Sequence, residues 1–465
     1  MSEKTQAELL SEQLFANEKN AYFEATQQDI DLAYKFCEKY TDFLNKSKTE
    51  RLFAANTIEL AKANGFTEFC PNKKYSAGDK VYVLHRNKAV ILCVIGKEPI
   101  EKGVRIAAAH IDSPRIDLKP NPLYEAEGLG YFKTHYYGGI KKYQWPTIPL
   151  CLYGVIVKSD GEKVEVSVGD KPTDPKFVIT DLLPHLAVEQ SKRTLNEGIK
   201  GEELNILIGS RPFNDDKASQ AVKLNLMKLF NEKYGIVESD FQSAELEFVP
   251  AFEACDIGFD RSLIGGYGHD DRVCAYPAVM AALNTNAPEK TVVTVLADKE
   301  EVGSDGNTGL CSAFMANFFN DLAKQQGTEG YIVLRNSQCL SADVNVAYDP
   351  TFSDVTEKNN TAFINKGVCI TKYTGARGKS GTSDASAEYM GFIRKLLIDN
   401  KVVWQTGELG KVDAGGGGTV AMFIANLDVD TIDLGVPVLS MHAPFEVVSK
   451  MDVYMAYRAF YVFFN

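Results

Sequence analysis

The sequence of 465 residues lacks the features of an exported or membrane-spanning chain. Its start, MSEKTQAELLSEQ, has no apolar core behind a basic segment, and no stretch of about 18 apolar residues, the length of a membrane helix, occurs anywhere. The nine cysteines are odd in number, are scattered from Cys37 to Cys369 and never form a Cys-x-x-Cys pair. This spacing disfavours a disulfide framework and a thiolate metal site. We therefore expect a soluble cytoplasmic protein, not associated with a membrane, that binds any metal through oxygen and imidazole.

The chain also lacks a cluster of basic residues. Its 50 Lys and Arg are outnumbered by 62 Asp and Glu, which gives a net charge of −12, and no long basic run occurs. Proteins that bind nucleic acids neutralise phosphates with clustered Lys and Arg. We therefore expect no nucleic-acid partner, and a small molecule or a peptide as substrate.

The length of the chain exceeds what one hydrophobic core usually covers, so two domains are expected. The first 65 residues predict helices, because apolar side chains such as Phe36, Tyr40 and Phe43 recur at helical spacing. Short strands follow. Val81 to Leu84 and Ala89 to Val94 predict a hairpin, and the apolar run that begins at Val104 ends at His110.

The stretch from about residue 119 to residue 244 is rich in turns and alternating strands. Val155 to Val157 and Val164 to Val168 flank Asp160-Gly161, a dipeptide that supplies the positive backbone angles of a tight hairpin. Beyond this stretch, strand-like runs at 292–296, 331–334 and 368–370 alternate with helical patterns such as Ser383 to Ile398.

This alternation predicts an α/β fold with a mixed sheet sandwiched by helices. Residues 1–114 and 245–465 would form this domain, and residues 115–244 would form an inserted β-rich domain.

Five short polar blocks carry the chemistry, and three of them follow apolar runs at 104–109, 292–296 and 436–439. The blocks are Ala109-His110-Ile111-Asp112-Ser113, His269-Asp270-Asp271-Arg272, Asp298-Lys299-Glu300-Glu301-Val302-Gly303, Ser341-Ala342-Asp343 and Ser440-Met441-His442. Strand ends of an open α/β sheet converge at its carboxyl edge, where ligands bind. Each block alone is typical of a cap, a turn or a solvated surface, but together they place imidazoles and carboxylates at one edge. Divalent metal ions accept this donor set and would compensate the paired acids.

The order His-x-Asp, Asp-Asp, Glu-Glu-Val-Gly, Ser-Ala-Asp and Met-His resembles the aspartyl aminopeptidase family of dizinc metallopeptidases, here in a bacterial form. The resemblance extends over nearly the whole chain and implies a zinc-peptidase-like fold whose inserted domain serves oligomerisation. It implies two divalent metal ions, most simply zinc, although cobalt or manganese can occupy such sites. Carried over, His110 and Asp343 would hold one ion, Glu301 and His442 the other, and Asp270 would bridge both.

The resemblance also assigns roles to residues that bind no metal. Asp112 would hydrogen-bond His110 and fix its tautomer, and Glu300 would act as the general base that takes a proton from water and passes it to the leaving amine. The product would be the released N-terminal residue of a peptide.

Two further residues are candidates for substrate binding. His185, in the inserted domain, is similar to a family histidine that reaches the active site of a neighbouring subunit, although a structural histidine after a proline turn has the same local sequence. Lys372, in a loop with Arg377 and Lys379, would bind an acidic N-terminal residue, although a solvated basic loop reads the same way. The resemblance implies a large homo-oligomer such as a dodecamer.

Other functions remain open at this point. Gly378-Lys379-Ser380 resembles the end of a phosphate-binding P-loop, but that motif needs glycine at position 373, where Tyr373 stands. The four glycines from Gly415 are interpreted as a tight turn beside the site. Within the dimetal enzymes, a carboxypeptidase or a deacylase is the alternative, because similar ligand orders serve those reactions.

Overall fold

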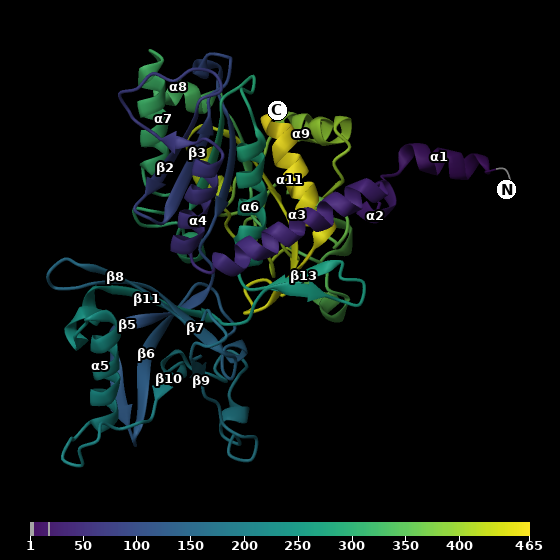
Figure 1. Ribbon diagram of the computed structural model, residues 1–465. Coiled ribbons are helices and arrows are strands. Elements are labelled where there is room, and N and C mark those ends of the chain that lie inside the picture. The colour runs from purple at the N-terminus through teal and green to yellow at the C-terminus, as the bar shows by residue number, and fades with distance from the viewer. Residues whose placement is uncertain (1–3, 17–18) are drawn as a thin grey trace.

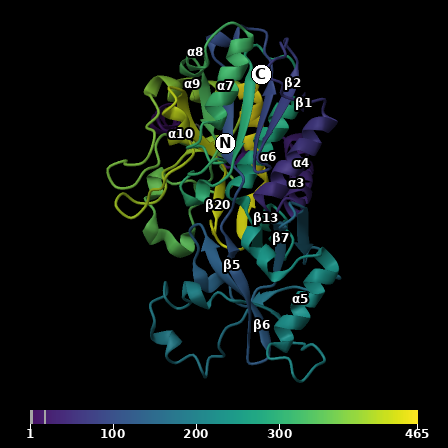
Figure 2. The same ribbon diagram turned by 90° about the vertical axis from the view of Figure 1, so that its left-hand side faces the viewer.

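The computed structural model describes residues 4–16 and 19–465. Figure 1 shows a large sheet with helices beside it, a smaller mainly β unit below, and helix α1 (Gln6–Leu14) extending to one side ahead of the short α2 (Ala21–Glu24). The turned view in Figure 2 again places β5, β6 and α5 below the helix-covered sheet. Within the described ranges, no helix combines the length and the apolar character needed to cross a membrane.

Nine strands form the central sheet. In spatial order they are β1 (Thr67–Glu68), β2 (Lys80–His85), β3 (Ala89–Val94), β14 (Val292–Ala297), β4 (Arg105–His110), β15 (Gln338–Ser341), β19 (Asp430–Gly435), β17 (Val368–Thr371) and β18 (Trp404–Thr406). The four central strands β14, β4, β15 and β19 run parallel, whereas β3 and β17 pair antiparallel on either side of them. The sheet is therefore mixed, as predicted, and β2 and β3 form the expected hairpin.

Helices cover both faces of this sheet. On one face lie α3 (Gln27–Lys46), α4 (Glu50–Ala63), α6 (His269–Asn284), α9 (Ala387–Asp399) and α11 (Lys450–Phe464), and on the other lie α7 (Phe314–Gln325), α8 (Gly330–Arg335) and α10 (Ala421–Ala425). Alternate residues of β4 supply the two cores, with Ala107 and Ala109 facing one and Ile106 and Ala108 the other. A strand buried on both faces is apolar throughout, which is why the sequence shows a continuous run here.

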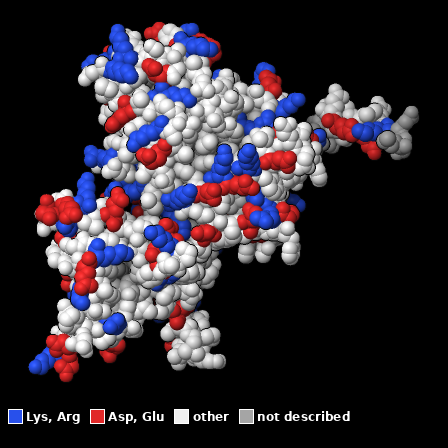
Figure 3. Space-filling view, viewed as in Figure 1, with Lys and Arg blue, Asp and Glu red and all other residues white. Residues whose placement is uncertain are grey.

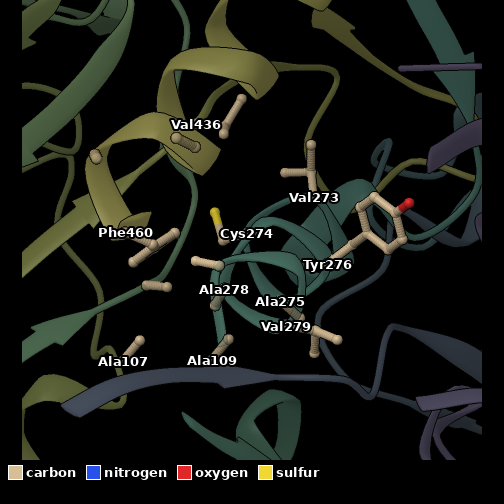
Figure 4. Packing of buried hydrophobic residues seen from close by; sticks show 14 of the residues in the cluster. Ala107, Ala109, Val273, Cys274, Ala275, Tyr276, Ala278, Val279, Val436 and Phe460 are labelled. Carbon is tan, nitrogen blue, oxygen red and sulfur yellow. The ribbon is translucent and has the colours of Figure 1, made fainter. Parts of the chain in front are cut away.

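Helix α6 lies close to the centre of the sheet because small side chains meet there. Figure 4 shows Ala107 and Ala109 of β4 below Ala278 and Cys274 of α6. This close contact brings the start of α6, with Asp270, to the edge where β4 ends.

A second sheet of seven strands forms the lower unit in Figure 1. In spatial order it contains β8 (Lys163–Val168), β7 (Leu150–Val157), β11 (Ala244–Pro250), β5 (Arg115–Ala126), β6 (Leu129–Tyr137), β10 (Ile206–Gly209) and β9 (Val178–Ile179), and α5 (Ala221–Tyr234) packs against it. The expected hairpin is present as β7 and β8. Strand β11 continues this sheet to Pro250, and an isolated bridge between Leu150 and Phe177 curls it.

A third sheet of five strands lies between these two units. Its order is β12 (Cys255–Ile257), β13 (Leu263–Gly266), β21 (Glu446–Ser449), β20 (Pro437–Leu439) and β16 (Asn345–Val346). The run at 436–439 therefore belongs to this small sheet and not to the central one, where β19 takes the expected place. Pro437 sits at the first position of β20, which suits a residue without a backbone N–H.

One predicted strand is wrong. Residues 331–334 belong to helix α8, and the strand of the central sheet comes later, as β15. Tyr331 is exposed whereas Val333 and Leu334 are buried against α7, a one-sided burial that suits a helix. A run of four apolar residues is too short to separate the two structures by pattern.

Candidate metal centre

The five predicted metal ligands lie together at the carboxyl edge of the central sheet. They are His110 at the end of β4, Asp270 at the start of α6, Glu301 in a single 3-10 turn after β14, Asp343 two residues after β15, and His442 in the turn between β20 and β21. The parallel strands β4, β14 and β15 supply three of these positions, because their carboxyl ends meet at one edge. Four segments that are far apart in the sequence thus meet the β20–β21 turn of the small sheet at this edge.

Asp270 stands between the two histidines. Its Oδ1 lies 3.1 Å from His110 Nε2, and its Oδ2 lies 3.1 Å from His442 Nε2. One carboxylate therefore presents one oxygen to each imidazole, which is the arrangement expected of a ligand shared by two ions.

The possible ligand atoms form three overlapping groups. Atoms of His110, Asp270 and Asp343 lie within 4.8 Å of one another, and so do those of Asp270, Glu301 and His442 and those of His110, Glu300 and Glu301. The first two groups share Asp270 and correspond to the predicted division between two ions, whereas the third brings Glu300 beside the ligands of both. Neutral imidazole nitrogen and carboxylate oxygen are donors that zinc accepts. The donor set therefore fits a pair of zinc ions, although the assignment of each ligand stays a prediction.

Both histidines direct Nε2 toward the cluster because Nδ1 has a partner elsewhere. His110 Nδ1 lies 3.0 Å from the backbone oxygen of Asp112 and 3.3 Å from its Oδ1. His442 Nδ1 lies 2.8 Å from the backbone oxygen of Gly139. An N–H donated to these acceptors leaves the Nε2 lone pair for a metal.

Gly139 is suited to this contact by its lack of a side chain. A Cβ at this position would lie 3.3 Å from His442 Nδ1. The segment that follows β6, in the lower unit, thus reaches the metal cluster of the upper unit.

Asp112 organises the loop that carries both glutamates. Its Oδ1 accepts the backbone N–H of Glu300 at 3.1 Å, and its Oδ2 accepts that of Glu301 at 3.2 Å. The Tyr137 hydroxyl donates to the same Oδ2 at 2.8 Å. Asp112 is fully buried and contacts His110 through Nδ1, so its contacts are those of a residue that positions His110 and the two glutamates.

Sequence reasoning missed Tyr137, Gly139 and Glu446. Glu446 accepts the backbone N–H of His442 at 2.7 Å and that of Asp270 at 3.1 Å, and burial raises its pKa to about 8. It therefore connects two ligands from different elements. The glycine pair that follows Tyr137 was the one visible signal of a close approach, and Glu446 stands in no motif.

The cluster contains more buried acid than its histidines can compensate. Burial raises the pKa of Glu300 to about 7 and holds the pKa values of Glu301 and Asp343 well above their usual range, and neighbouring carboxylates add to the shifts. Glu301 Oε1 is buried and has no hydrogen-bond partner among the described residues. Divalent cations at this place would favour the ionised carboxylates and give this oxygen a partner.

The histidines and Asp270 show the opposite behaviour. Burial lowers the pKa of His442, but the hydrogen bond to Asp270 outweighs it and leaves the pKa at about 10. Burial raises the pKa of Asp270, but hydrogen bonds to His110 and His442 bring it below the usual range. Protons on the imidazoles thus take the place of metal charge, and metal binding has to displace them.

The two predicted substrate residues lie outside this cluster. His185 is in an exposed loop after β9, and Lys372 follows β17, where its Nζ lies 2.5 Å from Asp384 Oδ1. Thr371 accepts a hydrogen bond from Asn345, two residues after Asp343, so the basic loop begins near the cluster. Neither role is tested by these contacts, and both stay predictions.

The loop that resembled a P-loop has a different structure. Lys379 Nζ forms an ion pair with Asp384 at 2.8 Å, and helix α9 begins only at Ala387, so no helix starts at Ser380. The backbone N–H of Gly375 donates to Gly417, so the glycine run packs on this loop. The arrangement is not that of a phosphate cradle, in which the helix begins at the Lys-Ser pair.

Comparison with known proteins agrees with the fold and identifies a family. The family described as Aminopeptidase I zinc metalloprotease (M18) matches residues 43–464. The Probable M18 family aminopeptidase 1 of Clostridium acetobutylicum is 47% identical over 455 residues, covering 96% of this chain and 98% of the relative, and that of Thermotoga maritima is 44% identical, covering 95% and 97%.

Solved structures share the whole architecture. The crystal structure of an M18 aminopeptidase from Thermotoga maritima has a TM-score of 0.93 at 42% identity and covers 97% of this chain and 100% of that chain. The structure of the S. cerevisiae mApe1 dodecamer has a TM-score of 0.74 at 22% identity, covers 93% and 96%, and shows a common fold alone.

A helix-covered mixed sheet with a histidine and carboxylate cluster at its carboxyl edge defines a metal-dependent hydrolase. The chain belongs to the M18 family of aminopeptidase I zinc metalloproteases, and it is a zinc-dependent aminopeptidase. The family resemblance, the enzyme class and zinc, all expected from the five motifs, are confirmed.

Proposed function

We propose that this aminopeptidase acts through two zinc ions, one held by His110 and Asp343, the other by Glu301 and His442, with Asp270 shared. The observation that carries the proposal is the position of Asp270, which presents one oxygen to each histidine at 3.1 Å. When bound, such ions acidify water and offset charge on the carbonyl oxygen of the substrate.

Glu300 serves as the general base. Its carboxylate lies 3.8 Å from His110 Nε2, at the border of the cluster, while its backbone is fixed by Asp112. The adjacent Glu301 points toward His442 instead, at 3.6 Å. The two glutamates lie nearest to different histidines, which supports a role in which Glu300 takes a proton from water and passes it to the leaving amine.

The N-terminal residue of a peptide is the group released. A free α-amino group can bind at the acidic cluster, which selects the chain end. Lys372 supports a preference for acidic side chains, since its ammonium group already holds the carboxylate of Asp384 and would hold a substrate carboxylate in the same way.

The unit formed by residues 115–244 serves self-association. The loop around His185 exposes a group of large apolar side chains: Leu182, Leu183, Leu186, Val188 and Leu195. Exposed apolar groups of this kind mark protein contacts. The yeast relative with the same fold is a dodecamer. A second copy of the chain would cover this loop, and His185 would then enter the neighbouring active site.

A panel of aminoacyl chromogenic substrates tests the proposal. Release from at least one N-terminal residue, lost with a chelator and restored with zinc, is the expected result. Zinc analysis of the active enzyme should give two ions per chain. One ion per chain at full activity would overturn the shared role of Asp270. Release from C-terminally blocked but not N-terminally blocked peptides would separate an aminopeptidase from the carboxypeptidase and deacylase alternatives.

A further inference from the structure

The lower unit contains an apolar cavity of about 470 Å³ that none of the metal-cluster residues lines. Its walls come from the inner face of the curled sheet, for example Phe132, Ile156 and Val168, and from Leu226 and Phe230 of α5. Figure 1 shows α5 lying along the sheet that these strands form. The cavity is thus the space between the sheet and the helix that closes it.

This space is an unfilled part of a hydrophobic core. Phe132, Ile156, Val168 and Leu226 all belong to the buried cluster of this unit. Protein interiors are normally close-packed, and an empty apolar space destabilises a fold in proportion to its volume. Pockets that bind small molecules have volumes of about 300–1,000 Å³ and mostly apolar walls. The volume and the walls therefore suit a ligand.

Two lysines lie at the mouth of the cavity, and the charge of Lys233 acts on the nearby Asp174 carboxylate, whose pKa is lowered chiefly by backbone hydrogen bonds. Lys176 and Lys233 line the cavity and are exposed, and Leu229 beside them is 51% exposed. Lys176 Nζ donates to backbone oxygens of Gly169 and Lys171. In the part of the chain that the structure describes, neither lysine forms an ion pair with a carboxylate.

Two polar groups, the Tyr234 hydroxyl and the Asp174 carboxylate, lie near the mouth of the cavity. The Tyr234 hydroxyl, whose residue also lines the cavity, is buried and has no hydrogen-bond partner among the described residues. Oδ2 of the neighbouring Asp174 accepts the backbone N–H groups of Gly169 and Lys171. The Tyr234 hydroxyl can donate a hydrogen bond to an anionic oxygen at this end of the cavity.

We propose that this cavity binds a single-chain carboxylate with an apolar tail, the chemical class of fatty acids. The tail occupies the space between the sheet and α5, and the carboxylate lies between Lys176 and Lys233, with the Tyr234 hydroxyl as a further donor. A slim chain suits the site better than a folded segment of another protein, because the walls lie behind α5 and the exposed residues are those at the mouth.

Binding is measured on the full-length zinc-loaded protein with a dansyl-labelled fatty acid as the fluorescent probe. We expect a saturable rise in fluorescence that decanoate reverses, whereas decanol competes less well and decylamine least. Equal competition by all three would show that charge plays no part. Absence of saturable binding would show that the space is closed or filled from within the assembly. Either result overturns the proposal.

Variants locate the site. Lys233→Gln should weaken decanoate binding about tenfold, the value of one charged contact, and leave decanol unchanged. Lys228→Gln is the matched control, because Lys228 is also exposed on α5 but pairs with Glu232 and does not line the cavity. Val168→Phe should abolish binding of both compounds by filling the space, with peptidase activity as the check that the chain is folded. Unchanged binding in both Lys233→Gln and Val168→Phe would place the probe elsewhere.

Discussion

The metal edge of the central sheet and the loop around His185 are both parts of the proposed active site, but the edge is buried and the loop is exposed to solvent. At the edge, every ligand is buried or partly buried and touches another member of the cluster. The loop exposes five large apolar residues to solvent and holds His185 among them. The residues of the edge come from one chain, whereas in the proposed function the loop acts only when it contacts a second copy.

The metal edge and the rest of the surface also differ in how their charged side chains are distributed. The metal edge concentrates carboxylates whose pKa values are raised by burial, so it needs cations. The surface shown in Figure 3 has acidic and basic side chains interspersed, with no broad field of one sign. Metal ions would compensate the buried carboxylates of the edge, and a second copy of the chain would cover the exposed apolar residues of the loop.

The largest effect is expected at Glu300. Glu300→Gln keeps the size of the side chain and its backbone contacts but cannot accept a proton. We expect kcat to fall by about 10³-fold, within the range for a general base, with zinc content unchanged. Stopped assays with metal analysis on the same sample measure both. Loss of zinc together with activity would instead make Glu300 a ligand.

His185→Ala should lower kcat by about 10²-fold, the value of one hydrogen-bond donor to the reacting carbonyl, while zinc content stays normal. His135→Ala is the matched control, since His135 is also exposed in the lower unit. The decisive measurement is the activity of oligomers that contain both variant chains. Hybrid oligomers of His185→Ala and Glu300→Gln chains should regain activity, because some sites combine an intact Glu300 with His185 from the neighbour.

Activity that stays at the sum of the two separate variants, in oligomers shown to be mixed, would assign His185 to its own chain. The loop would then act, like the metal edge, within a single chain.

The sequence predicted which residues lie together at the metal edge, but not the residues that support them. His110, Glu301 and Asp343 follow buried strands, and the geometry of parallel strands dictates that such positions meet. His442 was expected to follow a strand of the central sheet. It follows β20 of the small sheet instead, so it lies in the cluster for a different reason than the one predicted. Tyr137 and Gly139 were missed, because they reach the site through the way the second sheet packs against the first, and the glycine pair signals a close approach without showing what is approached.

The inserted unit illustrates the same limit. The Asp160-Gly161 turn predicted a hairpin correctly, because turn chemistry is local. Strand β11, which follows a long excursion through α5, returns to pair between β7 and β5 and carries the sheet past residue 244. Pairing between distant strands depends on the whole fold, whereas the boundary at residue 244 was predicted from a change in residue types, so the domain division stays a prediction.

A smaller effect is expected where the two units touch. Tyr137→Phe keeps the ring that stacks on Arg115 at 3.8 Å but removes the hydroxyl bonded to Asp112. We expect zinc affinity to fall by about tenfold, the lower end for partners of metal-positioning groups, with little change in thermal stability. Competition with a chromogenic chelator measures it. Tyr136→Phe, an exposed neighbour, is the control, and equal zinc affinities would mean that Asp112 is held without help from the lower unit.

The smallest effect concerns Lys372, and it depends on the substrate. Lys372→Met should raise KM for peptides that begin with Asp or Glu by about tenfold, because one charged contact is lost, and should leave neutral N-terminal residues unaffected. Lys379→Met is the matched control, since Lys379 contacts the other oxygen of the same Asp384. A parallel loss in both variants would mean that Asp384 and the loop, not Lys372, govern the preference. A loss for every substrate alike would place Lys372 in the support of the metal edge, because its neighbour Thr371 is bonded to Asn345 beside Asp343.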